Sequence, residues 1–379
     1  MHPVRTFFAV AAASLALATT AAAAPLPDAV GADAINGGFQ AMRNYNLIVL
    51  KDLQSSSEVQ GRTFVGGNLS GGSSNYLTSP GAQGTGGVAL TVGGDITGGA
   101  KNINNGGGIQ VGGNLDSGAN MNGGGGVKGD GNVKKVNANG AAVYADGNVE
   151  NTNAKDIYYG GTIKNSNGTK HAGDHSTAGL QAAIQAQGLL YEQELLATSN
   201  YLADLDATHT MSLTTQQATF NPGTGSGVAV FAISDLKGQL NGKIQLIVNE
   251  GSGYDLIVIN VAGTTVSLPS SINFNGAATL GQKVIWNFFE ATSVNLGSKS
   301  WYGSVLAPNA ELRINNFIQG SVVAKSLVQN GAIKMNNFSS AVNVNEMRAG
   351  IPEPATWAMM ILGFGAIGAV VRRRRAALA

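Results

Sequence analysis

The sequence contains no cysteine, so disulfide bonds cannot stabilise it, and stability must come from burial and backbone hydrogen bonds. Basic residues are also scarce away from the chain ends. When Arg5 and the arginines at 372–375 are taken from the 23 Lys and Arg, 18 remain against 22 Asp and Glu. The body therefore carries a net charge of about −4 and has no basic patch, which argues against nucleic acid as a partner.

Residues 1–24, MHPVRTFFAVAAASLALATTAAAA, have the pattern of a secretory signal peptide. One basic residue, Arg5, precedes an apolar stretch from Phe7 to Ala18, and an alanine run follows. The apolar part is too short to span a membrane, and cleavage is expected near Ala23. The sequence therefore predicts an exported protein.

The other end, residues 351–379, predicts a membrane anchor. The uncharged residues 355–371 form a segment that is about 25 Å long as a helix, against a hydrocarbon core of about 30 Å. The flanking basic residues can extend their charged ends to the interface and keep the tail cytoplasmic. They form the membrane stop and are Arg372, Arg373, Arg374 and Arg375. A buried terminal core helix is the alternative, but it would not require four consecutive charges.

A glycine-rich repeat occupies the first half of the body. Its units are FVGGNL, TVGGDI, QVGGNL, KGDGNV, YADGNV and YYGGTI, and their fifth residues are Asn68, Asp95, Asn114, Asn132, Asn148 and Thr162. The last four intervals lie within 14 to 19 residues, which suits one coil of a β-helix, and such coils must stack to bury their apolar faces. The first interval, 27 residues, is expected to contain a protruding loop over 70–87. A disordered glycine-rich linker is the alternative interpretation.

The bends of these units are expected to use glycine for positive φ. Residues 176–208 change to helical periodicity, with an apolar stripe that includes Ile184, Leu195 and Leu202, and with Ser176 or Thr177 as N-cap. Strand-like runs return after Met211, and WYGSVLA and IQGSVVA repeat at an interval of 17. The predicted fold is mainly β: one β-helix of irregular coils, interrupted by one long amphipathic helix packed alongside, and followed by a C-terminal transmembrane helix.

The body over about 33–345 resembles the choice-of-anchor A family, on YNLIVLKDLQSSSEVQGRTFVGGNLSGG, VIWNFFEATSVNL and WYGSVLAPNAEL. The tail resembles the PEP-CTERM sorting signal in its PEPxxWA form, through Pro352, Glu353, Pro354, Trp357 and Ala358. Together with the signal-peptide pattern, these resemblances divide the chain into a signal peptide at 1–24, a choice-of-anchor A-like β-helix domain at 25–350 and a sorting signal at 351–379.

The tail resemblance implies processing by an exosortase, a membrane transpeptidase of Gram-negative bacteria that make exopolysaccharide. The body resemblance implies a surface role, and collagen adhesion has been attached to some relatives. The two prolines keep the Pro-Glu-Pro segment extended, so that an enzyme cleft can bind it.

Few residues indicate chemistry. HAGDH places His171, Asp174 and His175 within five residues, which makes them weak candidates for metal ligands. The alternative interpretation is a polar loop in which Asp174 or Ser176 caps the following helix. GDGN at 129–132 and ADGN at 145–148 resemble calcium repeats, but ordinary turn chemistry explains them equally. Stacked coils would align Asp95, Asp130 and Asp146, either as a catalytic groove or as solvated turn residues.

Aromatic residues offer two interpretations, a sugar-stacking platform or core packing, and they are Tyr144, Tyr158, Tyr159, Trp286, Trp301 and Tyr302. Regular Thr-x-Thr columns, typical of an ice-binding face, are missing. The sequence therefore predicts a non-enzymatic protein without cofactor, sorted to the cell surface or biofilm matrix, with exopolysaccharide or a host polymer as partner. A carbohydrate- or ice-binding module is the alternative, followed by a polysaccharide-active enzyme.

Overall fold

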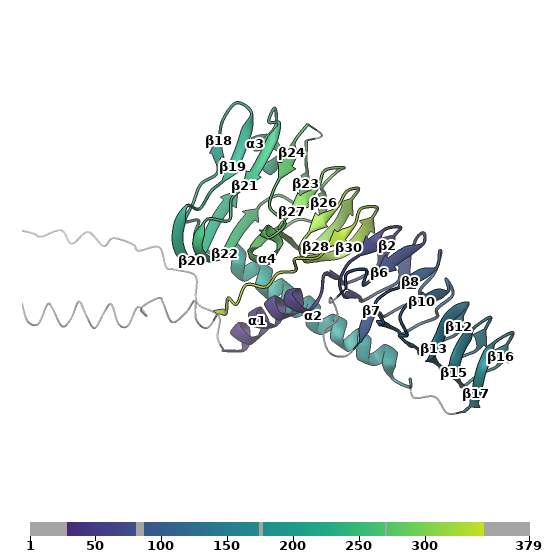
Figure 1. Cartoon of the computed structure of the whole chain (residues 1–379). Helices are drawn as coiled ribbons and strands as arrows, with labels where there is room; N and C mark the ends of the chain where they lie inside the picture. Colours follow the sequence, from purple (N-terminus) through teal and green to yellow (C-terminus); the bar gives the residue numbers. More distant parts are fainter. Residues whose placement is uncertain (1–28, 81–86, 174–176, 270, 345–379) are drawn as a thin grey trace, which may run out of the picture.

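Short parallel strands stack along one axis into a long β-solenoid (Figure 1). This is a computed structural model that describes residues 29–80, 87–173, 177–269 and 271–344. Each full coil of the first half contributes a strand or a bridge to three ladders, which form the three faces of the solenoid. The predicted mainly-β architecture with a long parallel sheet is confirmed.

Two helices cover the first ladder, here called the helix face. They are α1 (Ala29–Asn44) and α2 (Leu180–Ala203), which pack against each other (Figure 1). From one end of the solenoid to the other, the strands of this face are β20 (Thr224–Ile233), β22 (Ser252–Val261), β25 (Val284–Asn287), β28 (Ser304–Ile314), β30 (Val322–Gln329), β1 (Leu47–Val49), β4 (Thr63–Val65), β7 (Val88–Val92), β9 (Gly108–Val111), β11 (Val127–Gly129), β13 (Val136–Ala145), β15 (Asn153–Tyr159) and β17 (Asn167–Ala172).

The second ladder is called the charged face. It contains β23 (Thr265–Ser267), β26 (Ser293–Asn295), the second parts of β28 and β30, β2 (Leu53–Ser55), β5 (Leu69–Ser70), bridges at Ile96 and Leu115, β12 (Val133–Lys134), β14 (Val149–Glu150) and β16 (Ile163–Lys164).

The third ladder is called the asparagine face. It contains β18 (Ser212–Leu213), β19 (Gln217–Phe220), β21 (Gln245–Val248), β24 (Asn273–Asn275), β27 (Trp301–Tyr302), β29 (Ile318–Gln319), β31 (Ile333–Lys334), β3 (Glu58–Val59), β6 (Ser74–Tyr76), β8 (Lys101–Ile103), β10 (Ala119–Met121) and the first parts of β13, β15 and β17. Two short helices, α3 (Leu236–Leu240) and α4 (Leu280–Lys283), lie in connections of the second half.

The coils do not stack in sequence order. The last long strand, β30, pairs with the first strand, β1, so that Leu47 lies opposite Val322 and the Val322 N–H donates to the Asn46 carbonyl at 2.9 Å. The chain winds from β1 to β17, returns through α2, restarts at β20 and winds back to β1. The β-helix expected from the sequence is therefore two half-solenoids joined at a seam between β30 and β1.

Helix α2 has the length that this return path requires. Its 24 residues span about 36 Å. It contacts strands from β9 to β22, and these lie seven steps apart along the helix face, or about 34 Å at a strand spacing of about 4.8 Å. One straight helix thus covers both half-solenoids and holds the seam between them.

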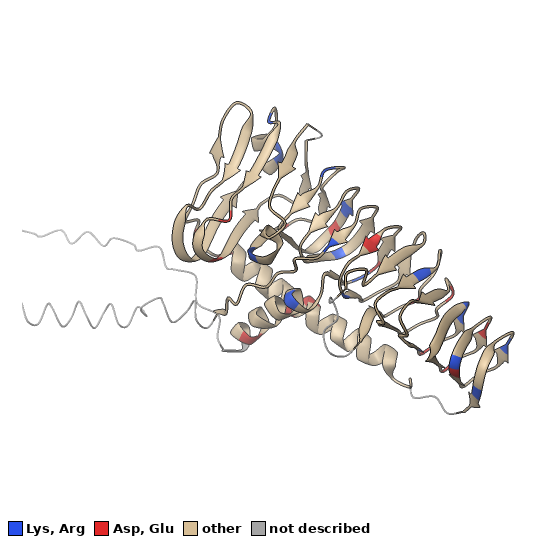
Figure 2. Ribbon diagram, in the orientation of Figure 1, with Lys and Arg blue, Asp and Glu red and all other residues tan. Residues whose placement is uncertain are grey.

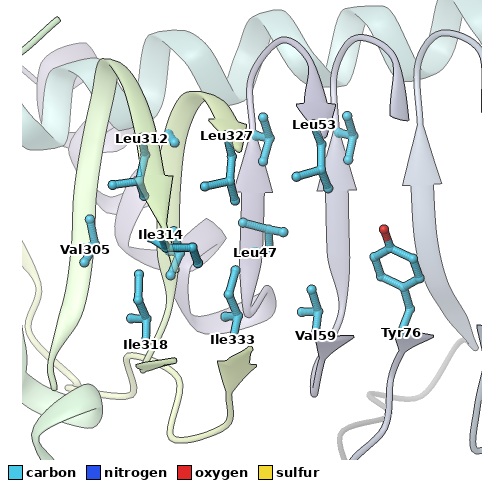
Figure 3. Packing of buried hydrophobic residues seen from close by; sticks show 14 of the residues in the cluster. Leu47, Leu53, Val59, Tyr76, Val305, Leu312, Ile314, Ile318, Leu327 and Ile333 are labelled. Atoms are coloured by element: carbon cyan, nitrogen blue, oxygen red, sulfur yellow. The ribbon is translucent and has the colours of Figure 1, made fainter. Parts of the chain in front are cut away.

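Apolar columns fill the solenoid interior (Figure 3). Leu312, Leu327 and Leu53 are successive register partners of one column, and each is buried. Residues that alternate with the interior positions point the other way, and on the helix face they pack against the helices. Ile48 and Phe64 belong to this second cluster, whereas Leu47 lies inside. Inward and outward residues are thus both apolar where α1 and α2 cover the sheet.

The apolar stripe expected for the long helix is confirmed, since Ile184, Leu195 and Leu202 are buried against the helix face. Two buried asparagines of the sheet also hold the helix. The Asn260 side chain donates to the Leu202 carbonyl at 2.6 Å, and the Asn287 side chain donates to the Ser199 carbonyl at 2.8 Å. These bonds fix the register of α2 on the sheet.

Two local expectations were wrong, and one helix was not predicted. Helix α2 is shorter than 176–208, and its N-cap is Gly179, without a side-chain cap of its own. The segment 70–87 is not simply a protruding loop, because 74–76 form β6 of the asparagine face. Helix α1 was not predicted, because its glycines weaken the helical signal. Those glycines permit close contact with α2, since a Cβ on Gly38 would lie 2.1 Å from the Thr198 hydroxyl oxygen.

Candidate binding faces

The glycine-rich repeat forms a hydrogen-bonded corner ladder between the helix face and the charged face. Each marker residue accepts, through its side-chain oxygen, the backbone N–H of the marker in the next coil. The bonds, 2.7 to 2.9 Å long, run from Asp95 N to Asn68, Asn114 N to Asp95, Asn132 N to Asn114, Asn148 N to Asn132 and Thr162 N to Asn148. The sequence separations of these bonds are the intervals of the repeat, so the predicted coil assignment is confirmed.

Glycine in these bends serves close approach rather than positive φ, which corrects the sequence prediction. Gly112 and Gly113 both have φ outside the left-handed region. A Cβ on Gly113 would lie 2.3 Å from Asp95 Oδ1, the oxygen that receives the Asn114 N–H. Each glycine before a marker therefore leaves space for the acceptor oxygen of the preceding coil.

Two of the three aligned carboxylates hold the start of the long helix rather than line a groove. Asp95 belongs to the corner ladder. Asp130 accepts the backbone N–H of Gln181 at 2.9 Å, in the first turn of α2, where a carboxylate is favoured. Asp146 accepts the hydroxyl of buried Thr177 at 2.6 Å. Asp130 thus supplies an acceptor that the N-cap glycine lacks, and Asp146 holds the segment just before the helix.

His171 lies on the last coil of the helix face, beyond α2. Its Nε2 is 3.2 Å from Asp156 Oδ1, and its ring stacks on Tyr158 with centroids 4.3 Å apart. Asp174 and His175 lie outside the described residues, and within the described part no three His, Asp or Glu residues could hold a metal ion together.

The aromatic residues do not form an open platform. Tyr144 stacks face to face on Tyr158 at 4.5 Å, so their faces contact each other rather than solvent. Trp286 and Trp301 are buried in the solenoid interior, with ring centroids 4.6 Å apart, which confirms the core interpretation. Tyr159 and Tyr302 are partly buried against the same interior.

The asparagine face carries a straight column of outward amides over the first half-solenoid. Six asparagines are successive register partners: Asn75, Asn102, Asn120, Asn137, Asn153 and Asn167. The Asn102 amide donates to Asn75 at 3.1 Å, and the Asn120 amide donates to Asn102 at 2.9 Å. Beside them, Asn122 donates to Asn104 at 3.1 Å.

Sequence reasoning missed this column, although a signal was present. Each of these asparagines follows a marker of the glycine-rich repeat by five to seven residues. The offset varies because the turn between the charged face and the asparagine face varies in length. The register is therefore evident only once the strands are paired.

In the coils that carry the asparagine column, the charged face presents charged side chains instead of amides. Lys134 pairs with Asp116 at 2.8 Å, and Glu150 and Lys164 are register partners one coil further on. Figure 2 shows both basic and acidic residues on the coils near the far end of the solenoid. Lys134 has its pKa raised by the hydrogen bond and the charge of Asp116. The Lys134 ammonium group is thus partnered by a carboxylate of the preceding coil.

A shallow polar hollow of about 400 Å³ lies beside α4, lined by Glu250, Tyr254, Asp255 and Lys283 among others. Glu250 accepts the hydroxyl of Thr279 and lies 3.8 Å from the Lys283 ammonium group. Its carboxylate is thus held by a hydroxyl and a cation of the same short helix region.

The membrane and sorting predictions fall outside the described residues. No helix in the described ranges is long and apolar enough to cross a bilayer, and the expected span at 355–371 is not among them. The signal peptide at 1–24 and the motif from Pro352 to Ala358 lie outside as well.

Comparison with protein families gives two matches. A model described as "Putative Ice-binding-like adhesive domain" matches residues 38–134 and 107–335, which together cover most of the chain. A model described as the PEP-CTERM protein-sorting motif matches residues 350–375. A search of curated proteins finds no match, and a search of solved structures finds none either.

Proposed function

The chain belongs to the ice-binding-like adhesive domain family, and from this premise we propose that it is a non-enzymatic adhesin of the bacterial cell surface or exopolysaccharide matrix. The observation that carries the proposal is the sorting motif at 350–375, directly after the adhesive domain. That motif implies recognition by an exosortase and sorting to the envelope of a Gram-negative bacterium. A solenoid suits adhesion, because its repeated faces present many equivalent contacts to a polymer.

The pathway proposed is export through the signal peptide at 1–24, retention by the apolar span at 355–371 and its arginine stop, and exosortase processing at Pro352, Glu353 and Pro354. We propose further that the body is of the choice-of-anchor A type. The engagement of Asp95, Asp130 and Asp146 by backbone and hydroxyl donors favours adhesion over polysaccharide cleavage.

Processing is tested by the mass of the C-terminal peptide of protein extracted from the surface of a host that has an exosortase. The expected terminus lies near Pro354. Changing Pro352, Glu353 and Pro354 to alanine should leave the chain intact and in the inner membrane, whereas Pro80→Ala, at an exposed proline of the body, should be sorted normally. Surface protein that still ends at Ala379 would overturn the processing step.

A further inference from the structure

We propose that the asparagine face of the first half-solenoid binds a neutral, hydroxyl-rich polysaccharide chain. The inference rests on the adhesive function proposed above and names its ligand class. The binding surface consists of the column from Asn75 to Asn167 together with the flanking Asn104 and Asn122.

The amides have hydrogen-bonding capacity left for a ligand. An asparagine side chain has two N–H donors and an oxygen with two lone pairs. Asn102 uses one donor toward Asn75 and one lone pair toward Asn120. One donor and one acceptor therefore remain at that rung. Sugar hydroxyls both donate and accept hydrogen bonds, so they match a row of amides, which do the same. Carboxylates only accept and lysine ammonium groups only donate.

The lack of charge selects a neutral ligand. The column contains only amides from Asn75 to Asn167, and an anionic polymer would need Arg or Lys for strong charge-assisted bonds. On the charged face of the same coils, Lys134 and Asp116 are already paired with each other. The two exposed faces thus differ in the chemistry that they present.

The repeat of the column favours an extended polymer over a single sugar. Its six amides span about 24 Å at a strand spacing of about 4.8 Å. One exposed hydrogen bond contributes only about 0.5–1.5 kcal/mol, so useful affinity needs several rungs at once. At Asn75, Asn102 and Asn120, the bonds between neighbouring amides hold the side chains in place before binding, which lowers the entropy lost on contact.

The test uses the purified full chain in mild detergent, sedimented with cellulose or chitin powder and, separately, with the anionic polymer alginate. The variant Asn120→Ala/Asn137→Ala/Asn153→Ala should weaken binding to the neutral polymers at least tenfold. A matched variant, Gln54→Ala/Ser70→Ala/Thr97→Ala, removes three uncharged polar side chains from the charged face and should bind like the wild type.

If the triple variant does not fold, the double variant Asn137→Ala/Asn153→Ala is tested instead, because both side chains are exposed. Its binding to the neutral polymers should be weaker by about threefold or more. Equal loss in the Gln54 control set, preference for alginate, ice-crystal shaping without glycan binding, or no binding to cellulose or chitin would each overturn the proposal. A chain that binds glycan in this assay but is not processed in cells would contradict only the sorting pathway.

Discussion

Lys101 is a charged residue inside an apolar solenoid. It occupies an inward position of β8, its side chain is fully buried, and its ammonium group donates to the Gly72 carbonyl at 2.8 Å. Burial lowers the pKa of Lys101 from 10.5 to about 8. Burial also raises the pKa of nearby Tyr76 to about 12, so this tyrosine stays neutral where the lysine titrates. Lys101 is therefore an interior group that changes charge at moderately alkaline pH.

The stability of the protein should depend on pH through this lysine. Between pH 8 and 10.5 the folded state releases the Lys101 proton while the unfolded state retains it, so the contribution of Lys101 to stability rises with pH in that window and is constant below it. Relative to Lys101→Met, the free energy of unfolding of the wild type should increase by about 1–2 kcal/mol from pH 8 to pH 10. Urea unfolding across this range measures the difference.

The control is Lys155→Met, which changes an exposed lysine of β15. Its pH profile should run parallel to that of the wild type. Parallel profiles for Lys101→Met as well would show that Lys101 has an ordinary pKa in the folded state.

At the scale of the coil, the sequence predicted the period and missed the chemistry that sets it. The intervals between Asn68, Asp95 and Asn114 identified the coils, because one side chain must reach the next backbone N–H in every turn. The conformation of the preceding glycines was predicted wrongly. Turn statistics favour glycine for its positive φ. Here glycine is required because a Cβ would contact the acceptor oxygen of the neighbouring coil, and this contact exists only once the coils have stacked.

The close fit at the corner ladder predicts a large cost for one methyl group. In Gly113→Ala the new Cβ would displace Asp95 Oδ1 from the Asn114 N–H, and overpacking plus the loss of this part-buried hydrogen bond should destabilise the protein by about 2–4 kcal/mol. Gly72→Ala is the matched control, since its Cβ would lie 3.2 Å from the Ser56 Cβ at an exposed site. Similar denaturant midpoints for the two variants would contradict the role given to the ladder.

At the scale of the whole molecule, the order of the coils could not be read from the sequence. The helix-face strands near the seam, such as β28, β30, β1 and β4, all present similar short apolar runs, so no local pattern states that β30 pairs with β1. Buried Asn46 identifies the seam in the structure, because its amide donates to the Gly320 carbonyl at 2.9 Å and accepts the Gly61 N–H at 3.0 Å. The asparagine face escaped prediction for the same reason, since its column exists only in the paired register.

The outer edge of β17 is the end of the first half-solenoid, and open strand edges invite association between copies of a chain. Lys170 takes the register position that Ile157, Val143 and Val127 occupy in the preceding coils, so a charge replaces the interior apolar residue at this end. A second copy that stacked on β17 would have to bury that ammonium group without a partner, which is costly. The lysine thus opposes end-to-end growth of the solenoid.

Lys170→Val should therefore cause concentration-dependent self-association of the full chain in detergent, measured by sedimentation velocity, while the wild type keeps one sedimentation coefficient. Lys155→Val removes the same charge from β15, which is paired on both sides, and should behave as the wild type. Association of both variants would assign the effect to net charge. Association of neither would mean that the edge of β17 is protected by something other than the lysine.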